Sequence, residues 1–316
     1  MGDFPPLDLS KVRTIPLKDR PTKVGVADLA KPFEVGSSFK QFIDSIPHQW
    51  GGVEFRDAIE AIAQASANKR PIIWGMGAHV IKNGLSPLII QLIESGVVSA
   101  LVFNGAGLIH DFELSFAGST SEDVSDRLGQ GDFGMGRETA EFLNRSVTEG
   151  DKENLGFGAS AQHAIKNIKL PHQNISLIRY SALRKIPLFV VVAIGTDTIH
   201  FHPSIDPGAL GRALHRDVLG LSGVVADMEG GVFLNIGSAV LIPEVFLKAL
   251  TLSRNLGHQV EKITTINFDF IKQYRPEENV VRRPTLKRGR GISFIGQHEL
   301  LIPMFAAALM ERVAQK

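Results

Sequence analysis

Residues 71–107 read PIIWGMGAHVIKNGLSPLIIQLIESGVVSALVFNGAG. Two short apolar runs, Pro71–Trp74 and Val97–Phe103, flank a stretch of helical periodicity from Leu85 to Ser95, and Gly96 lies just beyond that stretch. Buried parallel strands are continuous apolar runs, and glycine is favoured directly after the last turn of a helix. The segment therefore predicts a strand–helix–strand unit in which each strand ends in a glycine-containing turn.

The same alternation continues along the rest of the chain. Helices are predicted at 55–68, 159–168, 175–183, 207–219, 241–254 and 300–313, and further strands at 188–194, 231–236, 262–268 and 291–295. Strands that alternate with helices predict a mostly parallel sheet with helices on both faces, which is a Rossmann-like α/β fold.

Three segments depart from this pattern. Residues 1–50 contain scattered prolines and no sustained period, so we expect an N-terminal extension before a single α/β domain over 51–316. Residues 118–158 are polar and rich in glycine, which predicts either an excursion that acts as a lid or a plain surface loop. The basic, proline-containing stretch 275–290 is predicted to be a loop.

The composition excludes several kinds of protein. The 316 residues include no cysteine, so disulfides, thiolate catalysis and cysteine-ligated metal clusters are excluded. The formal net charge of +1 gives no field that favours nucleic acid. No apolar run is long enough to cross a membrane, and the N-terminus lacks the pattern of a signal peptide. We expect a cytoplasmic protein with a small-molecule substrate, no nucleic-acid partner and no membrane partner.

Histidines follow three of the predicted strands. They are His79, His110, and the pair His200 and His202. Open α/β sheets bind ligands at the carboxyl ends of their strands, so these turns are expected to meet at one site and to make the chain an enzyme. Histidine is readily tuned for proton transfer near neutral pH, which makes His110 a candidate general acid/base, with Glu113 three residues further on.

Metal binding is an alternative role for these histidines. His200 and His202 would point the same way on an extended chain, and His79 and His110 could complete a divalent site. The chain has no close-spaced ligand motif such as H-E-x-x-H, so metal is disfavoured and a structural or substrate-contacting role is preferred.

Glycine-rich turns suggest where a dinucleotide would bind. Asn104-Gly105-Ala106-Gly107 follows a strand and opens a helix, where backbone N–H groups favour a phosphate, although a tight turn without a ligand is equally consistent with it. Gly237-Ser238 repeats the theme, and Asp269 follows the next strand, where it could accept hydrogen bonds from ribose.

Five cations lie close together near the C-terminus. They are Arg282, Arg283, Lys287, Arg288 and Arg290. The stretch has no aromatic stacking partners for nucleic acid. It is predicted to be either a solvated loop or a clamp that holds a phosphate or carboxylate in a neighbouring site.

These residues, taken in order, resemble the deoxyhypusine synthase superfamily, in particular its bacterial deoxyhypusine synthase-like branch. The most specific match is Gly75-Met-Gly-Ala-His79-Val-Ile-Lys82 followed by Asn104-Gly-Ala-Gly107, and a looser match continues through Asp197-Thr-Ile-His-Phe-His202 to Gly237-Ser238. The resemblance covers roughly residues 50–295.

The resemblance implies an NAD-binding homotetramer with active sites at subunit interfaces. It implies transferase chemistry on a polyamine, in which the aminobutyl group of spermidine moves to an enzyme lysine and then to a protein lysine. It places Asp197 where the family holds the amine. The residues that it assigns to the NAD site are His79, Lys82, Asn104, Gly105, Ala106, Gly237, Ser238 and Asp269, and Gly107 belongs to the same turn.

The chain departs from the family at the reacting groups. The family's catalytic lysine lies in a Trp-Gly-Lys motif, where this chain has Lys287-Arg288-Gly289-Arg290-Gly291. A guanidinium cannot form the imine that an amine forms. The family's acid after the glycine-rich turn is His110 here, and arginines replace the acids that hold the polyamine.

We therefore expect a retained fold and a changed reaction, namely an NAD-binding enzyme that acts on a small amine or amino-acid-like substrate. His110, Asp197 and His200 are the expected catalytic residues, and Glu113, His202, Arg283 and Arg290 the expected substrate contacts. A metal-dependent enzyme that uses the histidines and a non-catalytic ligand-binding homologue are the alternatives.

Overall fold

The computed structural model describes residues 4–314, and the chain divides into two units, 1–53 and 54–316. The first unit contains three single-turn 3₁₀ helices, Leu9–Lys11, Leu17–Asp19 and Val26–Asp28, and one α-helix, α1 (Phe39–Ser45). A capping box starts α1, because the N–H of Gln41 donates to the Ser38 hydroxyl and the Gln41 side chain accepts from the N–H of Ser38.

Helices and strands alternate through the second unit. Its first helix, α2, begins a few residues before the unit does. In chain order the elements are α2 (Trp50–Ala67), β1 (Ile72–Met76), α3 (His79–Lys82), α4 (Ser86–Glu94), β2 (Ala100–Asn104), α5 (Gly105–Ala117), α6 (Val124–Leu128), α7 (Arg137–Lys152), α8 (Phe157–Lys166), α9 (Leu177–Arg184), β3 (Leu188–Val191), α10 (Pro207–Ala226), β4 (Val232–Ile236), α11 (Leu241–Asn255), β5 (Thr264–Asp269), α12 (Tyr274–Pro276), β6 (Arg290–Ile295) and α13 (His298–Ala314). None of the helices within residues 4–314 is long and apolar enough to cross a membrane.

The six strands form one sheet in the order β3-β2-β1-β4-β5-β6, and every neighbouring pair is parallel. This arrangement confirms the predicted Rossmann-like α/β class. The order of strand addition reverses between β1 and β4, where Trp74 is paired with Leu101 on one side and with Leu234 on the other. In open α/β sheets such a reversal opens a crevice beyond the carboxyl ends of the two strands.

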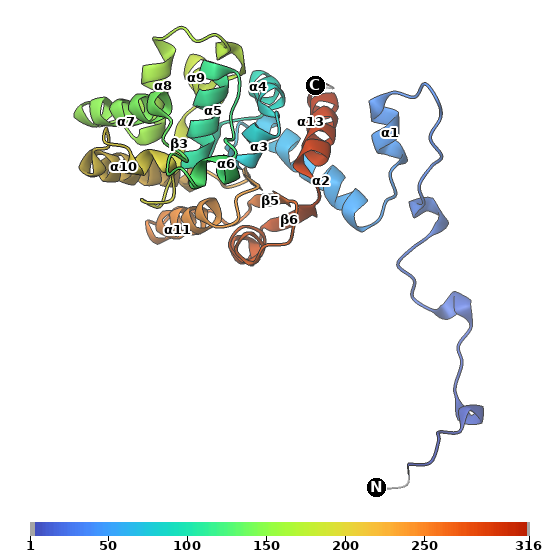
Figure 1. Cartoon of the computed structure of the whole chain (residues 1–316). Helices are drawn as coiled ribbons and strands as arrows, with labels where there is room; N and C mark the ends of the chain where they lie inside the picture. Colours follow the sequence, from blue (N-terminus) through green and yellow to red (C-terminus); the bar gives the residue numbers. More distant parts are fainter. Residues whose placement is uncertain (1–3, 315–316) are drawn as a thin grey trace. The chain divides into compact units, whose positions relative to one another are not determined.

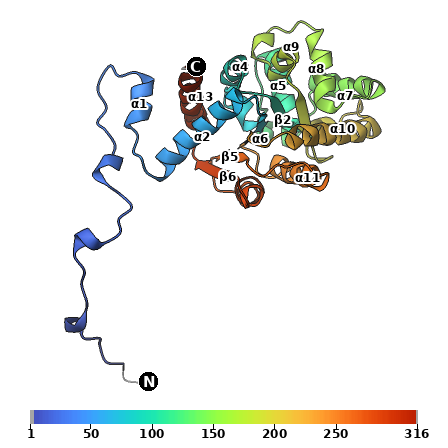
Figure 2. The same cartoon turned by 180° about the vertical axis from the view of Figure 1, so that it is seen from behind.

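Helices cover both faces of the sheet. Figures 1 and 2 show α4, α5 and α9 on one side and α10 and α11 on the other. On the α11 side, the stacked rings of Phe233 and Phe246 have centroids 3.7 Å apart. On the opposite side, Phe268 of β5 meets Phe305 of α13 with centroids 5.0 Å apart. Because both faces are packed, the strands carry almost continuous runs of buried residues.

The prediction of a loop over residues 275–290 is wrong. Most of this stretch is helical, with α12, a π-helical turn Glu277–Arg282 and a 3₁₀ turn Arg283–Thr285. The reason lies in its side chains, which pair at helical spacing. Arg282 donates to Glu278 at 2.8 Å and Arg283 donates to Asn279 at 2.6 Å. Net positive charge and two prolines made these pairs hard to recognise in the sequence.

The polar segment 118–158 is only partly irregular. α7 lies inside it and packs against its neighbours through buried residues that include Leu143 and Val147. Residues 118–136, which we call the excursion, hold the exposed helix α6 and three glycines of positive φ, Gly118, Gly131 and Gly134.

A buried carboxylate ties three elements together beside β3. Asp217 of α10 accepts hydrogen bonds from the N–H groups of Gly158 at the start of α8 and of Val190 in β3, each at 3.0 Å. Burial raises the pKa of Asp217 to about 7, although these backbone N–H groups oppose the shift.

We expect Asp217→Ala to lower the free energy of unfolding by about 2–4 kcal/mol, because it leaves two buried N–H groups without partners. The folded state holds the Asp217 proton more tightly than the unfolded chain does, so the stabilisation that Asp217 gives is complete near pH 4 and declines as the pH rises towards 7. Denaturant unfolding at both pH values measures the effect. The exposed Asp227→Ala, at the end of the same helix, is the control and should change stability by less than about 0.5 kcal/mol. Equal effects of the two substitutions would contradict the structural role of Asp217.

Candidate active site

A cavity of about 570 Å³ opens at the carboxyl ends of β2 and β3. Its wall combines α3, α5, the excursion, α7 and the loop that follows β3. The polar or charged side chains on this wall are Lys82, His110, Glu113, Ser119, Thr120, Ser121, Glu122, Glu138, Thr139, Thr196, Asp197 and Thr198. Three distant parts of the sequence therefore contribute to one pocket.

The N-terminus of α5 is held by side chains of the chain itself. Asn104 caps the helix, and its side-chain oxygen accepts from the N–H of Gly107 at 2.9 Å. The N–H of Ala106 donates to the carboxylate of Asp197. A Cβ atom on Gly105 would lie 2.0 Å from Asp197 Oδ2, so only glycine permits this approach. An anion that bound to this turn would have to displace Asp197.

Asp197 is a buried acid with an unsatisfied oxygen. It is 9% exposed, and its Oδ2 has no hydrogen-bond partner. Burial raises the pKa of Asp197 to about 6, while the hydrogen bond from Ala106 and the charge of His110 oppose that rise. A buried carboxylate oxygen without a partner is costly to the fold, so a cationic group in the cavity would be strongly favoured beside it.

His110 is joined to two side chains on the cavity wall. Its Nδ1 lies 2.6 Å from the Thr120 hydroxyl and 3.6 Å from Glu113 Oε2. The Thr120 hydroxyl in turn donates to Glu113, which also accepts from Thr139 at 3.4 Å. Burial alone would raise the pKa of Glu113, but the nearby His110 and the hydrogen bond from Thr120 outweigh it and hold this pKa below its usual value. Glu113 is therefore charged at neutral pH.

The excursion reaches the opposite wall of the cavity through Gly134. Its N–H donates to Glu122 at 2.8 Å. A Cβ atom on Gly134 would lie 2.3 Å from Cγ2 of Thr198, the neighbour of Asp197 in the chain. The excursion thus touches His110 through Thr120 and the loop of Asp197 through Gly134.

His200 and His202 have local partners. His200 Nδ1 accepts from the N–H groups of Gly195 at 3.1 Å and Asp197 at 3.2 Å, so a neutral His200 carries its proton on the buried, unpartnered Nε2. Burial lowers the pKa of His200, which favours this neutral form. His202 Nδ1 lies 2.7 Å from the Ser204 hydroxyl.

A second polar cluster lies at the switch point between β1 and β4. The N–H of Gly77 donates to the carbonyl of Ile236 at 2.8 Å, and a Cβ atom on Gly77 would lie 2.2 Å from the carbonyl oxygen of Gly237. Gly237 has φ +66°, and a Cβ there would meet the ring of His298 at 2.7 Å. The backbones of Gly77 and Gly237 and the buried ring of His298 are therefore in contact without intervening side chains.

His79 and Asp269 border this crevice. The His79 ring has its centroid 5.7 Å from Phe270 and 6.3 Å from His298. Asp269 ends β5, and its Oδ2 is buried without a partner. Burial raises the pKa of Asp269, and the N–H of Phe270 opposes the shift.

The four buried aspartates fall into two groups. Asp111 and Asp217 are engaged through their carboxylates by backbone N–H groups, and Asp111 also accepts from the Ser176 hydroxyl at 2.6 Å, so both are structural. Asp197 and Asp269 each keep one unpartnered oxygen. Asp197 lines the cavity and Asp269 ends β5, so these are the two buried aspartates that the fold leaves partly unsatisfied.

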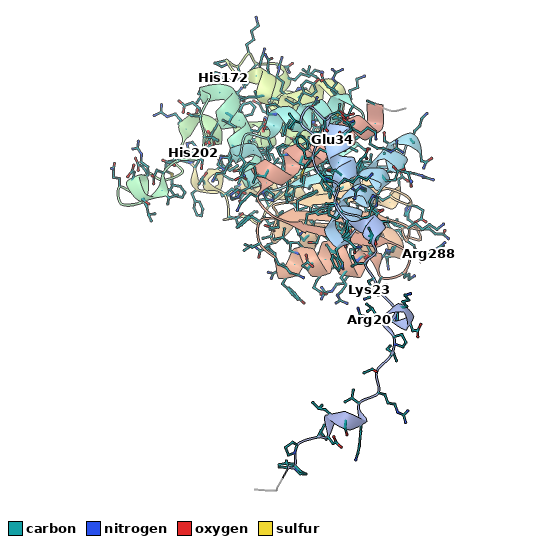
Figure 3. All side chains as sticks on the ribbon, turned by 90° about the vertical axis from the view of Figure 1, so that its right-hand side faces the viewer. Arg20, Lys23, Glu34, His172, His202 and Arg288 are labelled. Atoms are coloured by element: carbon teal, nitrogen blue, oxygen red, sulfur yellow. The ribbon has the colours of Figure 1, made fainter. Side chains whose placement is uncertain are left out.

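Other predicted residues have structural roles in this chain. Ser238 accepts from the N–H of Ile242 at 3.3 Å in the first turn of α11. Arg290 begins β6, at the amino end of the sheet, and pairs with Asp57. Arg283 is held by Asn279 and Glu278. In Figure 3, Arg288 of the same basic stretch lies on the other side of the domain from His202.

The three segments predicted to meet at one site contribute Lys82, His110 and Asp197 to the same cavity. Of the four histidines only His110 is among its lining residues, and His200 and His202 have local partners. Within residues 4–314, no group of three or more histidine, aspartate or glutamate side chains is placed to hold a metal ion. The metal-dependent alternative has no structural support there.

Two important residues were not identified from the sequence. Thr120 belongs to the polar excursion, where nothing in the local pattern distinguishes it from its neighbours. His298 begins α13 and is 1% exposed. A histidine directly after the last predicted strand was an available signal for it, of the kind used for the other three turns.

No family model and no curated protein sequence matches this chain. Among solved structures, a putative deoxyhypusine synthase from Entamoeba histolytica is similar, with a TM-score of 0.51 and 12% identity over 89% of this chain and 96% of that chain. AgrE in complex with ornithine and NAD⁺ gives a TM-score of 0.50 and 12% identity over 86% of this chain. This chain spans only 34% of the AgrE chain. These likenesses confirm the deoxyhypusine synthase-like fold.

We expect Gly105→Ala to lower the free energy of unfolding by about 1–3 kcal/mol, because the new methyl group would overlap Asp197 and force it away from α5. Gly211→Ala is the matched control, since a Cβ there meets nothing within 4 Å on a helix, and it should stabilise the protein by up to about 1 kcal/mol. Denaturant unfolding compares the two. Equal stability of both variants would show that Asp197 does not lie against Gly105.

Proposed function

We propose that this chain is an NAD-dependent enzyme that oxidises a small amine or amino-acid-like substrate, with Asp197 as the counter-ion of the amine and His110 as the general acid/base. The observation that carries the proposal is the buried, unpartnered Oδ2 of Asp197 on the wall of a cavity that also presents His110. A substrate ammonium in the cavity would satisfy that oxygen.

NAD is assigned to the crevice at the switch point. The close approach of Gly77 and Gly237 leaves no side chain between the ends of β1 and β4, and Asp269 offers an unpartnered acceptor for ribose hydroxyls. His79 and Phe270 flank the same place with aromatic surfaces. The solved complex of AgrE with ornithine and NAD⁺, on a similar fold, supports this choice of cofactor. When bound, NAD supplies an acceptor for a hydride.

The cavity and the crevice adjoin at α3. His79 begins this helix and borders the crevice, while Lys82 ends it and lines the cavity. A substrate in the cavity could therefore present a carbon atom to a cofactor in the crevice. Lys82 is the nearby cation that would hold a substrate carboxylate if the substrate is an amino acid.

The residues of the chain would hold the substrate's charge and transfer its proton. Asp197 orients the ammonium group, and His110 removes one of its protons, which leaves the neutral amine whose lone pair assists loss of the hydride from the adjacent carbon. The product is then an iminium ion, and its positive charge remains beside Asp197. The excursion would exclude water from the cavity as a lid.

A covalent transfer step is not assigned. Lys287, in the stretch that corresponds to the family's catalytic lysine motif, pairs with Glu261 at 2.8 Å. His202, Arg283 and Arg290 remain proposed substrate contacts, but only if the site lies at a subunit interface. The chain would then form a homotetramer in which a neighbouring subunit presents the basic stretch. Such an arrangement fits the position of Arg290 at the amino end of its own sheet.

We expect NADH to form when the protein is incubated with NAD⁺ and a panel of small amines and basic amino acids. His110→Ala should abolish this turnover, by at least about 100-fold, and leave the fold intact, because a general acid/base contributes about that much. Asp197→Asn should raise KM strongly, since it removes the charge that holds the amine.

The Asp197→Asn variant also distinguishes a loss of substrate binding from a loss of folding. An asparagine carries no buried charge, so the variant should be at least as stable as the wild type above pH 6, where the wild-type carboxylate is ionised. Unaltered turnover in His110→Ala would refute the role of that residue. Binding of amines without any NADH formation would favour the alternative of a non-catalytic ligand-binding homologue.

A further inference from the structure

Thr120 connects the candidate base to a charged partner. The Thr120 hydroxyl is within hydrogen-bond reach of His110 Nδ1, at 2.6 Å, and it donates to the Glu113 carboxylate. The direct distance between His110 Nδ1 and Glu113 Oε2 is 3.6 Å, too long for a good hydrogen bond. The hydroxyl therefore provides the contact between the histidine and the acid.

The number of available protons determines the direction of these bonds. A threonine hydroxyl has one hydrogen, and an ionised carboxylate can only accept. With its hydrogen given to Glu113, the Thr120 oxygen can only accept from His110. A neutral His110 then carries its proton on Nδ1, so that its Nε2 keeps a free lone pair.

We infer that Thr120 is a positioning residue that fixes the tautomer of His110 and thereby makes Nε2 the atom that accepts the substrate proton. This inference deepens the proposed function and rests on it. When Nε2 takes up a proton, the positive charge of the ring is stabilised by Glu113 through the Thr120 hydroxyl. The arrangement performs the task of the orienting acid in a catalytic triad, with a hydroxyl inserted between the acid and the histidine.

The location of Thr120 makes the excursion part of the catalytic machinery. The chain leaves α5 at Gly118, whose φ is +74° and where a Cβ would lie 2.7 Å from Nε2 of His172. The N–H of His172 donates to the carbonyl of Ser115 at 3.0 Å. This contact sets where the excursion begins, two residues before Thr120, so displacement of the excursion would remove the hydroxyl from His110.

Other charged groups face the same cavity. They are Lys82 from α3, Glu122 from the excursion, Glu138 from α7 and Asp197 from the loop after β3. Within residues 4–314, the polar partners of His110 Nδ1 are Thr120 and Glu113. The tautomer of His110 is therefore governed by Thr120 rather than by these more distant charges.

The test is the ¹⁵N NMR spectrum of the imidazole of His110 in the full chain, assigned by its loss in His110→Ala. The neutral wild type should carry its proton on Nδ1. Thr120→Val should lose this preference and lower kcat by about 10-fold or more with little change in KM, whereas Thr120→Ser should retain both the tautomer and kcat within about threefold. Thr251→Val is the control for the loss of a threonine hydroxyl at an exposed position of a helix, here α11, and should change neither.

A wild-type proton on Nε2, or an Nδ1 proton that persists in Thr120→Val, would overturn the inference. If Thr120→Val does not fold, Glu113→Leu serves instead, because it removes the acceptor to which the threonine donates, and an unchanged tautomer there would equally overturn the inference. The NMR measurement needs neither NAD nor substrate. Absence of turnover in the wild type would therefore refute the proposed function and leave the tautomer result intact.

Discussion

Contact between the backbones of Gly77 and Gly237 determines how the carboxyl edge of the sheet is organised. A side chain on Gly77 would overlap the Gly237 carbonyl, and one on Gly237 would overlap His298. β1 and β4 can therefore lie side by side up to their last residues, and the order of strands reverses at that place. The cavity beyond β2 and β3 and the crevice beyond β1 and β4 lie on either side of α3 as a consequence.

Buried carboxylates show which polar groups maintain the fold and which remain available. Asp111 and Asp217 receive backbone N–H groups from the starts of α9 and α8, so their burial is compensated. Asp197 and Asp269 each retain an oxygen without a partner. Leaving a buried acceptor unsatisfied costs about 1–3 kcal/mol, and a ligand that satisfies it recovers that free energy on binding. Among the buried aspartates, this cost falls on the two that we assign to the substrate and the cofactor.

Much of the fold could be predicted from local sequence, because each strand is a short apolar run and each helix has a periodic face. The run from Pro71 to Phe103 predicted two strands and a helix, and the structure has all three. The stretch 275–290 was wrongly predicted to be a loop, because its helical pairs depend on Glu278 and Asn279, which lie among many cations. Charge and proline counts do not reveal such pairing.

The candidate site was less predictable, because it depends on tertiary contacts. The rule that ligands bind at the carboxyl ends of parallel strands located His110 and Asp197 correctly at the carboxyl edge of the sheet. It could not separate the cavity from the crevice, since that separation arises from the order of the strands. Nor could it identify Thr120, because only the fold brings this residue of the excursion to His110.

The most direct test of the account is native mass spectrometry of the freshly purified protein, with and without about 1 mM NAD, which is the upper end of ordinary substrate affinities. The account predicts an assembly of four chains that gains the mass of one NAD per chain. An Asp269→Ala variant should keep the assembly and lose most of the bound cofactor. An assembly whose mass does not change with NAD would contradict the assignment of the crevice as a cofactor site.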